Sequence, residues 1–134
     1  MEPLPEAFMD LFERKTVAHF ATMMPDGTPQ VTPVWIDADE EGYVLVNTAR
    51  NRRKEKNVRE NPRVGVSIPD PEDPYRYLSI RGEVEEVTTE GAIDHIDALA
   101  QRYFDREEYP HHGEEVGERV IIRIRPDRVV SSGN

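Results

Sequence analysis

Residues 48–54, Thr-Ala-Arg-Asn-Arg-Arg-Lys, combine residue types that bind phosphate. The segment leaves a predicted strand and enters a predicted helix, where the first backbone N–H groups and the helix dipole favour an anion. Arginine adds forked hydrogen-bond donors and lysine adds a point charge. The spacing lets Thr48 and Lys54 converge on one group, with Arg52 or Arg53 beside them. The segment is therefore a candidate phosphate site, with a solvated helix face as the alternative.

Positive charge is concentrated in the same region. Between Arg50 and Arg63 lie seven of the 17 lysines and arginines, against only Glu55 and Glu60, in a chain of net charge −10. The segment therefore carries +5 and the rest of the chain −15. This contrast favours anion binding over a merely solvated face. The negative charge of the whole chain predicts no binding to nucleic acid or to an anionic membrane.

Aromatic residues mark two further candidate regions. Trp35, the only tryptophan, follows Pro33 by two residues and can either stack on a ring or cover the core. Tyr75, Tyr77 and Arg81 alternate along one face of a predicted strand. Such a composition is typical of an interface or a ligand contact, with ordinary surface as the alternative.

The other chemistry-bearing residues form no recognisable site. His95, His111, His112 and Glu114 match no standard zinc spacing, so we predict no metal. The chain contains no cysteine, nucleophile elbow, P-loop or glycine-rich dinucleotide motif, which excludes thiolate chemistry and leaves a hydrolase unsupported. No acid–base pair emerges, so the catalytic residues stay unassigned.

The hydrophobic pattern predicts the elements that position these residues. We expect helices over residues 6–14, 51–61 and 90–105 and strands over residues 17–24, 30–37, 43–48, 63–68, 75–87 and 119–130. Residues 25–28 have the chemistry of a turn. Pro33 points to an edge strand or a bulge, and Pro126 divides the closing strands. Residues 106–117 read as a polar, mobile loop.

This order of elements describes a small, mainly β barrel with helical caps. We expect a single domain over residues 1–134. The beginning of the chain carries acids and prolines where a secretory signal needs a basic and then an apolar stretch, so we expect the cytoplasm. No stretch approaches the roughly 18 apolar residues of a membrane span.

Several segments, taken in order, resemble the pyridoxamine 5′-phosphate oxidase-like family, and more narrowly its branch that uses the deazaflavin coenzyme F420. These segments are PDGTPQVTPVWID, YVLVNTARNRRKEKNVRENPRVGVSI, DPYRYLSIRGEVEEV, QRYFDREEYP and GERVIIRIRPDRV. The likeness runs from about Phe8 to Val130. It implies a six-stranded antiparallel split β-barrel that forms a homodimer, with two cofactors in grooves between the subunits.

The resemblance also implies a cofactor site. In flavin-using relatives a threonine and an Arg-Lys pair bind the phosphate, and Thr48, Arg53 and Lys54 stand at those positions. In the deazaflavin branch an arginine matching Arg52 contributes too. The strand from Thr32 to Trp35 matches the one beside the cofactor ring. The complete candidate set is Thr32, Pro33, Val34, Trp35, Asn47, Thr48, Arg52, Arg53, Lys54, Tyr77 and Arg81.

The activity that the resemblance implies is hydride transfer between F420 and a small, electron-poor organic substrate. The chain stops soon after Val130, without the substrate-binding tail of true pyridoxamine phosphate oxidases, which argues against that substrate. One alternative is an FMN-dependent enzyme on the same fold. The other is a non-catalytic protein that binds a flavin or haem, for which His19, His95, His111 or His112 would have to approach the iron.

Overall fold

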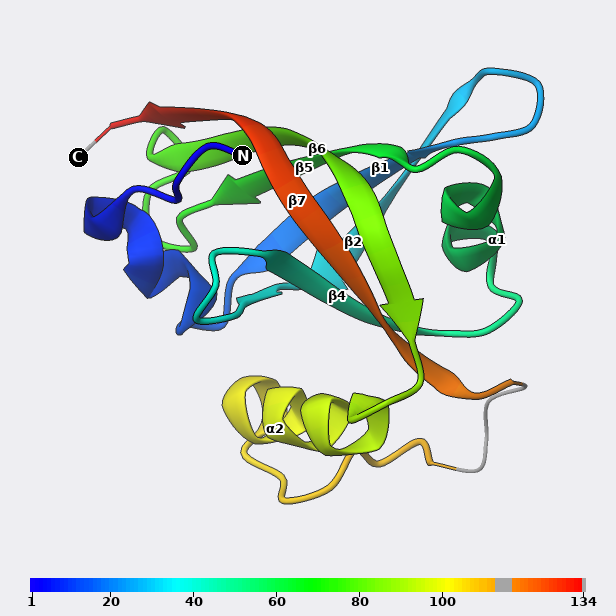
Figure 1. Ribbon diagram of the computed structural model, residues 1–134. Helices are drawn as coiled ribbons and strands as arrows, with labels where there is room; N and C mark the ends of the chain where they lie inside the picture. Colours follow the sequence, from blue (N-terminus) through cyan, green and yellow to red (C-terminus); the bar gives the residue numbers. More distant parts are fainter. Residues whose placement is uncertain (113–116, 134) are drawn as a thin grey trace.

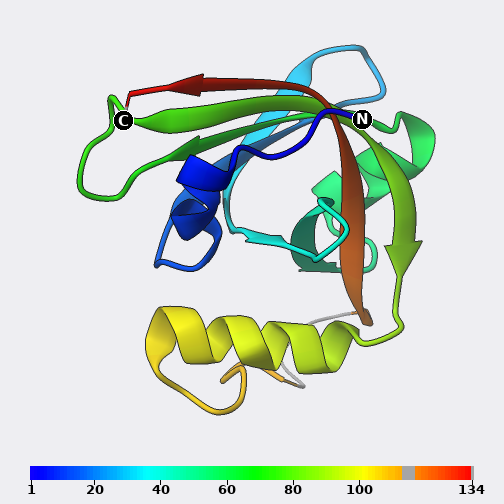
Figure 2. The same ribbon diagram turned by 60° about the vertical axis from the view of Figure 1, so that its left-hand side comes forward.

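The computed structural model describes residues 1–112 and 117–133. In these residues seven antiparallel strands form one curled sheet in the order β2-β1-β5-β6-β7-β4-β3 (Figure 1). Three helices accompany it, and Figure 2 shows α2 lying apart from the strands, across one end of the curl. The elements are η1 (Glu6–Phe12), β1 (Val17–Met23), β2 (Pro29–Trp35), β3 (Asp37–Ala38), β4 (Val44–Ala49), α1 (Arg53–Glu60), β5 (Arg63–Pro69), β6 (Tyr77–Thr88), α2 (Ala92–Phe104) and β7 (Arg119–Ser132).

The expected mainly β split barrel with three helices is confirmed, but the number of strands is not six. The predicted strand 30–37 breaks at Ile36 into β2 and β3, which lie at opposite edges of the sheet. Two consecutive strands can reach opposite edges only if the sheet curls back on itself. This break therefore produces the split in the barrel.

Helix α2 satisfies the backbone of Ile36, which has left the strand ladder. The Ile36 N–H donates to the Tyr103 hydroxyl at 3.2 Å, and its carbonyl accepts from Arg102 Nη1 at 2.7 Å. Ile36 is completely buried, so these partners replace water. Pro33 lies on β2, an edge strand, as its missing N–H predicts.

The closing strand differs from the prediction as well, because β7 continues through Pro126. Gly82 on β6 lies opposite Pro126, and the register shifts between Arg81 and Gly82. A Cβ on Gly82 would lie 2.3 Å from the carbonyl oxygen of Arg125, so only glycine lets the strands pass this closely. The irregularity at the proline is thus absorbed by a bulge. Strand β6 begins at Tyr77 rather than at residue 75.

The interior of the curl is apolar. Alternate residues of the strands face inward, and η1 covers one end of this core. Its largest fully buried hydrophobic side chains are Phe20, Leu11, Ile36, Ile68, Leu78, Ile80, Ile122 and Ile124. None of the helices in the described part of the chain is long and apolar enough to cross a membrane.

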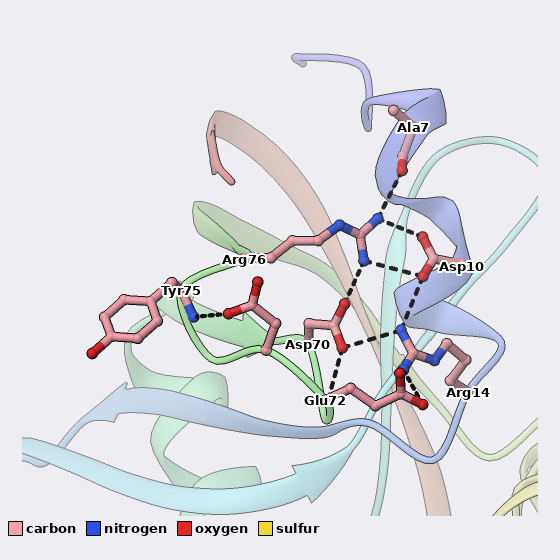
Figure 3. Close-up of polar contacts among 8 residues, drawn as sticks. Ala7, Asp10, Arg14, Asp70, Glu72, Tyr75 and Arg76 are labelled. Atoms are coloured by element: carbon pink, nitrogen blue, oxygen red, sulfur yellow. Dashed lines mark hydrogen bonds and ion pairs between the residues drawn. The ribbon is translucent and has the colours of Figure 1, made fainter. Parts of the chain in front are cut away.

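Arg76 fastens η1 to the loop between β5 and β6 (Figure 3). Its guanidinium donates to the Ala7 carbonyl at 2.9 Å, to Asp10 at 2.8 Å and to Asp70 at 2.8 Å. The bond from Arg76 lowers the pKa of Asp10. The backbone N–H of Glu72 and the Arg76 guanidinium together lower that of Asp70. The cluster therefore links segments that are 66 to 69 residues apart in sequence.

Candidate functional site

A pocket of about 390 Å³ opens between the edge of β2, the end of β4, the start of α1 and helix α2. One wall is apolar and aromatic, and the other carries hydroxyl, amide and cationic groups. Its lining residues are Val17, Pro33, Val34, Trp35, Asn47, Thr48, Arg52, Lys54, Ile96, Phe104, Tyr109, His111 and Arg119.

The polar wall forms where β4 ends and α1 begins. Thr48 is 2% exposed, and its Oγ1 has no hydrogen-bond partner among the described residues. Arg52, the residue before the first helical turn, and Lys54 line the pocket beside it. No side chain of the described residues caps this helix end. The arrangement presents an unsatisfied hydroxyl, two cations and the positive end of a helix, which suits a phosphate.

Two other cations of the segment, Arg50 and Arg59, pair with Glu55 of α1. Glu55 is completely buried, and its carboxylate contacts Arg59 Nε at 2.7 Å and Arg50 Nη1 at 3.6 Å. It also accepts the backbone N–H of Asn51 at 2.8 Å. Asn51 has a φ of +70°, in the left-handed region, so this bond supports the sharp turn from β4 into α1. Two of the seven cations are therefore neutralised within the chain.

The aromatic wall is centred on Trp35. Its ring stacks on Tyr103 with centroids 4.8 Å apart and planes at 7°. Phe104 and Tyr109 meet the Trp35 ring edge-on, at 4.9 and 6.2 Å. One side of Trp35 packs on α2 and the residue lines the pocket, so stacking on a bound ring stays a prediction. Burial raises the pKa of the Tyr103 hydroxyl, which donates to the carbonyl of Thr16.

Loop residues 106–112 are fastened to α2 by Asp97. Its carboxylate accepts the Tyr109 N–H at 2.8 Å and His112 Nε2 at 2.6 Å. Burial raises the pKa of Asp97, but these bonds outweigh it and hold the pKa below its usual value. Tyr109 and His111 are thereby placed against the pocket. The mobile loop was expected over residues 106–117. Residues 113–116, which include Glu114, lie outside the described residues.

The structure brings most of the predicted site residues together. Those that line the pocket are Pro33, Val34, Trp35, Asn47, Thr48, Arg52 and Lys54. The other four predicted residues, Thr32, Arg53, Tyr77 and Arg81, do not line it. Arg53 donates to Asn57 at 3.3 Å, away from the polar wall, and Thr32 lies opposite the inward-facing Phe20.

Tyr77 and Arg81 lie on the outer face of the sheet. They alternate with Leu78 and Ile80, whose side chains are buried inside the curl. Arg81 is the cross-strand partner of Gly65 and of Arg128. Within one chain neither Tyr77 nor Arg81 lines the pocket.

Sequence reasoning missed six of the lining residues: Val17, Ile96, Phe104, Tyr109, His111 and Arg119. Arg119 is the most informative of them, because its Nε donates to Asn47 Oδ1 at 2.9 Å and its guanidinium lies 5.0 Å from the centre of the Tyr109 ring. The only sequence signal was the aromatic and histidine content of residues 109–112. Arg119 carried no such signal in the sequence, because an arginine at the start of a strand is common and indicates no function.

Comparison with known proteins finds a matching family model and similar solved structures. The family model of pyridoxamine 5′-phosphate oxidase matches residues 4–132. A solved structure named F420 reductase is 36% identical, with a TM-score of 0.79 and coverage of 95% of this chain and 98% of that one. A conserved hypothetical protein from Mycobacterium tuberculosis is 25% identical, with a TM-score of 0.76 and coverage of 96% and 84%.

A third structure shows the same fold at lower identity. General stress protein 26 from Bacillus anthracis is 19% identical, with a TM-score of 0.69 and coverage of 95% of this chain and 92% of that one. No curated protein matches the sequence.

Proposed function

Since this chain belongs to the pyridoxamine 5′-phosphate oxidase family, a family of flavin-binding oxidoreductases, we propose that it is a reductase that uses the deazaflavin F420. Its second substrate is a small, electron-poor organic molecule. The observation that carries the proposal is the polar wall, where the buried, unsatisfied hydroxyl of Thr48 faces the same pocket as Arg52 and Lys54. The 36% identity to the structure named F420 reductase supports the choice of cofactor.

The different positions of Arg52 and Arg53 favour a deazaflavin over FMN. The resemblance assigns the Arg53-Lys54 pair to a flavin phosphate and adds Arg52 for the deazaflavin. Arg52 lines the pocket, whereas Arg53 is turned toward Asn57. The cation that accompanies Lys54 at the pocket is therefore the one that the deazaflavin branch uses.

The chain supplies binding and orientation for such a cofactor. A bound deazaflavin would supply hydride chemistry through its ring system. Thr48, Arg52 and Lys54 would hold the phosphate, and Pro33, Val34 and Trp35 offer a flat apolar wall for the rings. The described lining residues include no carboxylate, so the polar wall favours an anionic ligand throughout.

The proposal includes a homodimer. The outer face of the sheet carries small residues in its centre, Ala21, Gly65, Ser67 and Ser79, paired in register across β1, β5 and β6. Exposed valines surround them: Val17 is 46% exposed, Val31 58% and Val130 43%. A face with small residues in its centre and exposed apolar residues around them suits a second copy of the chain. A partner packed there would bring its Tyr77 and Arg81 close to the β2 edge of the pocket.

The test is a fluorescence titration of the purified protein with F420 and, in parallel, with FMN. We expect F420 to bind at micromolar concentration or below and FMN more weakly. Arg52→Ala and Lys54→Ala should each weaken F420 binding by about tenfold, since each removes a charge-assisted contact to phosphate. Arg53→Ala and the exposed control Lys56→Ala should stay within about twofold of the wild type.

The outcomes separate the alternatives. Tight binding of FMN with loss in Arg53→Ala would assign the protein to the flavin-using relatives. Binding of neither cofactor would contradict the proposal and direct the search to non-catalytic ligands. A Soret band in protein incubated with haem would identify the haem-binding alternative.

A further inference from the structure

A line of hydrogen bonds runs behind the pocket from β3 through α2 to β7. His95 Nε2 lies 2.9 Å from Asp37 Oδ2, and His95 Nδ1 lies 3.0 Å from Asn47 Nδ2. Asn47 Oδ1 accepts from Arg119 Nε at 2.9 Å. Asn47 and Arg119 line the pocket, and His95 stands behind them with 11% of its side chain exposed. A buried imidazole is thereby connected to a cation of the pocket wall.

The chemistry of the partners fixes the orientation of every group in this line. Asn47 Nδ2 also donates to the Ala92 carbonyl at 3.0 Å, which can only accept, and Arg119 Nε can only donate. The amide of Asn47 therefore points its NH₂ group at His95. His95 Nδ1 must offer a lone pair, and its proton must lie on Nε2, facing Asp37. The network is complete only with a neutral imidazole in this one tautomer.

The charged groups around the ring are Asp37 on β3, Arg102 on α2 and Arg119 on β7. Arg102 Nη2 donates to Asp37 Oδ1 at 2.9 Å. Burial raises the pKa of Asp37, but the bonds from His95 and Arg102 outweigh it and lower the pKa. Asp37 is therefore an ionised carboxylate that accepts the Nε2–H of His95, and a second proton on the ring would lie on Nδ1.

Protonation of His95 places an N–H against the NH₂ group of Asn47. Two donors cannot share this contact, so the Asn47 amide must turn or move away. Either movement removes the oxygen that holds Arg119 Nε and breaks the bond to the Ala92 carbonyl. The Arg119 guanidinium then loses the hydrogen bond that Asn47 provides at the pocket.

We propose that His95 is a positioning residue, whose neutral imidazole orients Asn47 so that Arg119 is held ready for an anionic ligand. Protonation of His95 switches this arrangement off. Arg119 would then be a pocket residue whose position depends on the protonation of His95. This inference rests on the proposed function only in that an anionic cofactor occupies the pocket.

The first test needs no cofactor. In ¹⁵N NMR spectra of the dimer or monomer as purified, His95 should be the Nε2–H tautomer at pH 8, and the Arg119 Nε–H and Asn47 amide signals should be protected from exchange. When His95 is protonated by lowering the pH, these two signals should shift together with those of the His95 ring. A His95 ring that carries its proton on Nδ1 at pH 8, or titration without change at Asn47 and Arg119, would overturn the proposal.

The second test uses F420 as the probe with two variants of one residue. In His95→Asn the side-chain oxygen can replace Nδ1 as the acceptor and cannot be protonated, whereas His95→Leu has no acceptor. At pH 8 we expect the wild type and His95→Asn to bind alike, and His95→Leu to bind about three- to tenfold more weakly. The affinity ratio of wild type to His95→Asn should fall as the pH drops, and this ratio cancels any titration of F420 itself.

The two proposals fail in different ways. If F420 does not bind to any of the three proteins, the proposed function fails while the NMR result still decides the role of His95. If F420 binds and the ratio is constant between pH 8 and pH 5, the positioning role is wrong and the proposed function stands. Equal weakening in His95→Asn and His95→Leu would also contradict the proposal, since it would indicate a merely structural histidine.

Discussion

Two buried threonines differ in one respect that matters for function. The hydroxyls of Thr48 and Thr16 both lack a hydrogen-bond partner among the described residues, and the two residues are 2% and 0% exposed. Only Thr48 lines the pocket. A buried hydroxyl without a hydrogen-bond partner lowers stability. This loss is tolerated more readily where a bound ligand supplies the hydrogen-bond partner.

We therefore expect different effects on binding from the same substitution at these two positions. Thr48→Val and Thr16→Val should each leave the free energy of unfolding equal or raise it by up to about 1 kcal/mol, because each removes an unpaired polar group. Thr48→Val should weaken F420 binding by about tenfold, and Thr16→Val should not change it. Chemical denaturation and fluorescence titration measure the two quantities. Equal F420 affinity in wild type and Thr48→Val would remove Thr48 from the site.

At the residue scale the sequence predicted the polar wall well but could not choose between adjacent arginines. Thr48 and Lys54 are separated by a strand end and a helix start, and this spacing indicated that they face one site; both line the pocket, and their binding of a phosphate stays a prediction. Arg52 and Arg53 differ only in their angle around the beginning of α1, which depends on the turn at Asn51. Arg119 and Asn47 are 72 residues apart, so no local pattern could join them.

At the element scale, η1 is held mainly by side chains. It belongs to no strand ladder, and Arg76 links it to the loop that contains Asp70. Arg14 on the following segment adds ion pairs to Asp10 and Asp70, each at 3.2 Å. Since η1 covers one end of the core with Phe8, its attachment matters for the whole barrel.

Arg76→Met should lower the melting temperature by roughly 5 °C or more, since the carboxylates of Asp10 and Asp70 lose their hydrogen bonds to the guanidinium. The pKa values of Asp10 and Asp70 are lowered in the folded state, so their contribution is fully present above about pH 4 and is lost as the pH falls further. Arg76→Met should therefore flatten the loss of stability below pH 4. Thermal unfolding between pH 7 and pH 2 measures this. If the melting temperatures of the wild type and Arg76→Met change with pH in parallel, Arg76 is not the cause of the lowered pKa values of Asp10 and Asp70.

The break at Ile36 is a feature of the strands that the sequence pattern alone does not predict. The alternation through residues 30–37 is strand-like on both sides of Ile36, and no glycine or proline marks the break. The break is stabilised by Arg102 and Tyr103, which approach from a helix more than 60 residues later. The other strands were predicted to within a few residues because their alternation follows a single buried face.

At the scale of the whole molecule, the outer face of the sheet is the largest feature without a role inside one chain. It contains the small residues of β1, β5 and β6 and lies next to the pocket through β2, whose residues Pro33 and Trp35 pair with His19 and Val17. A stable interface needs roughly 800 Å² from each partner, which a face of several strands can provide. The predicted residues Tyr77 and Arg81 are on this face.

We expect Ser67→Arg to convert a dimer into a monomer. Ser67 is exposed in the middle of the outer face, between His19 and Ser79, so two symmetry-related arginines would meet across a face-to-face interface. Thr89→Arg, at an exposed position before α2, is the control with the same charge change and should remain a dimer. Light scattering gives the mass of each protein, and titration with F420 shows whether the monomer binds. A wild-type monomer that binds F420 tightly would contradict the shared site, whereas a Ser67→Arg monomer with weakened binding would support a pocket completed by the partner's sheet.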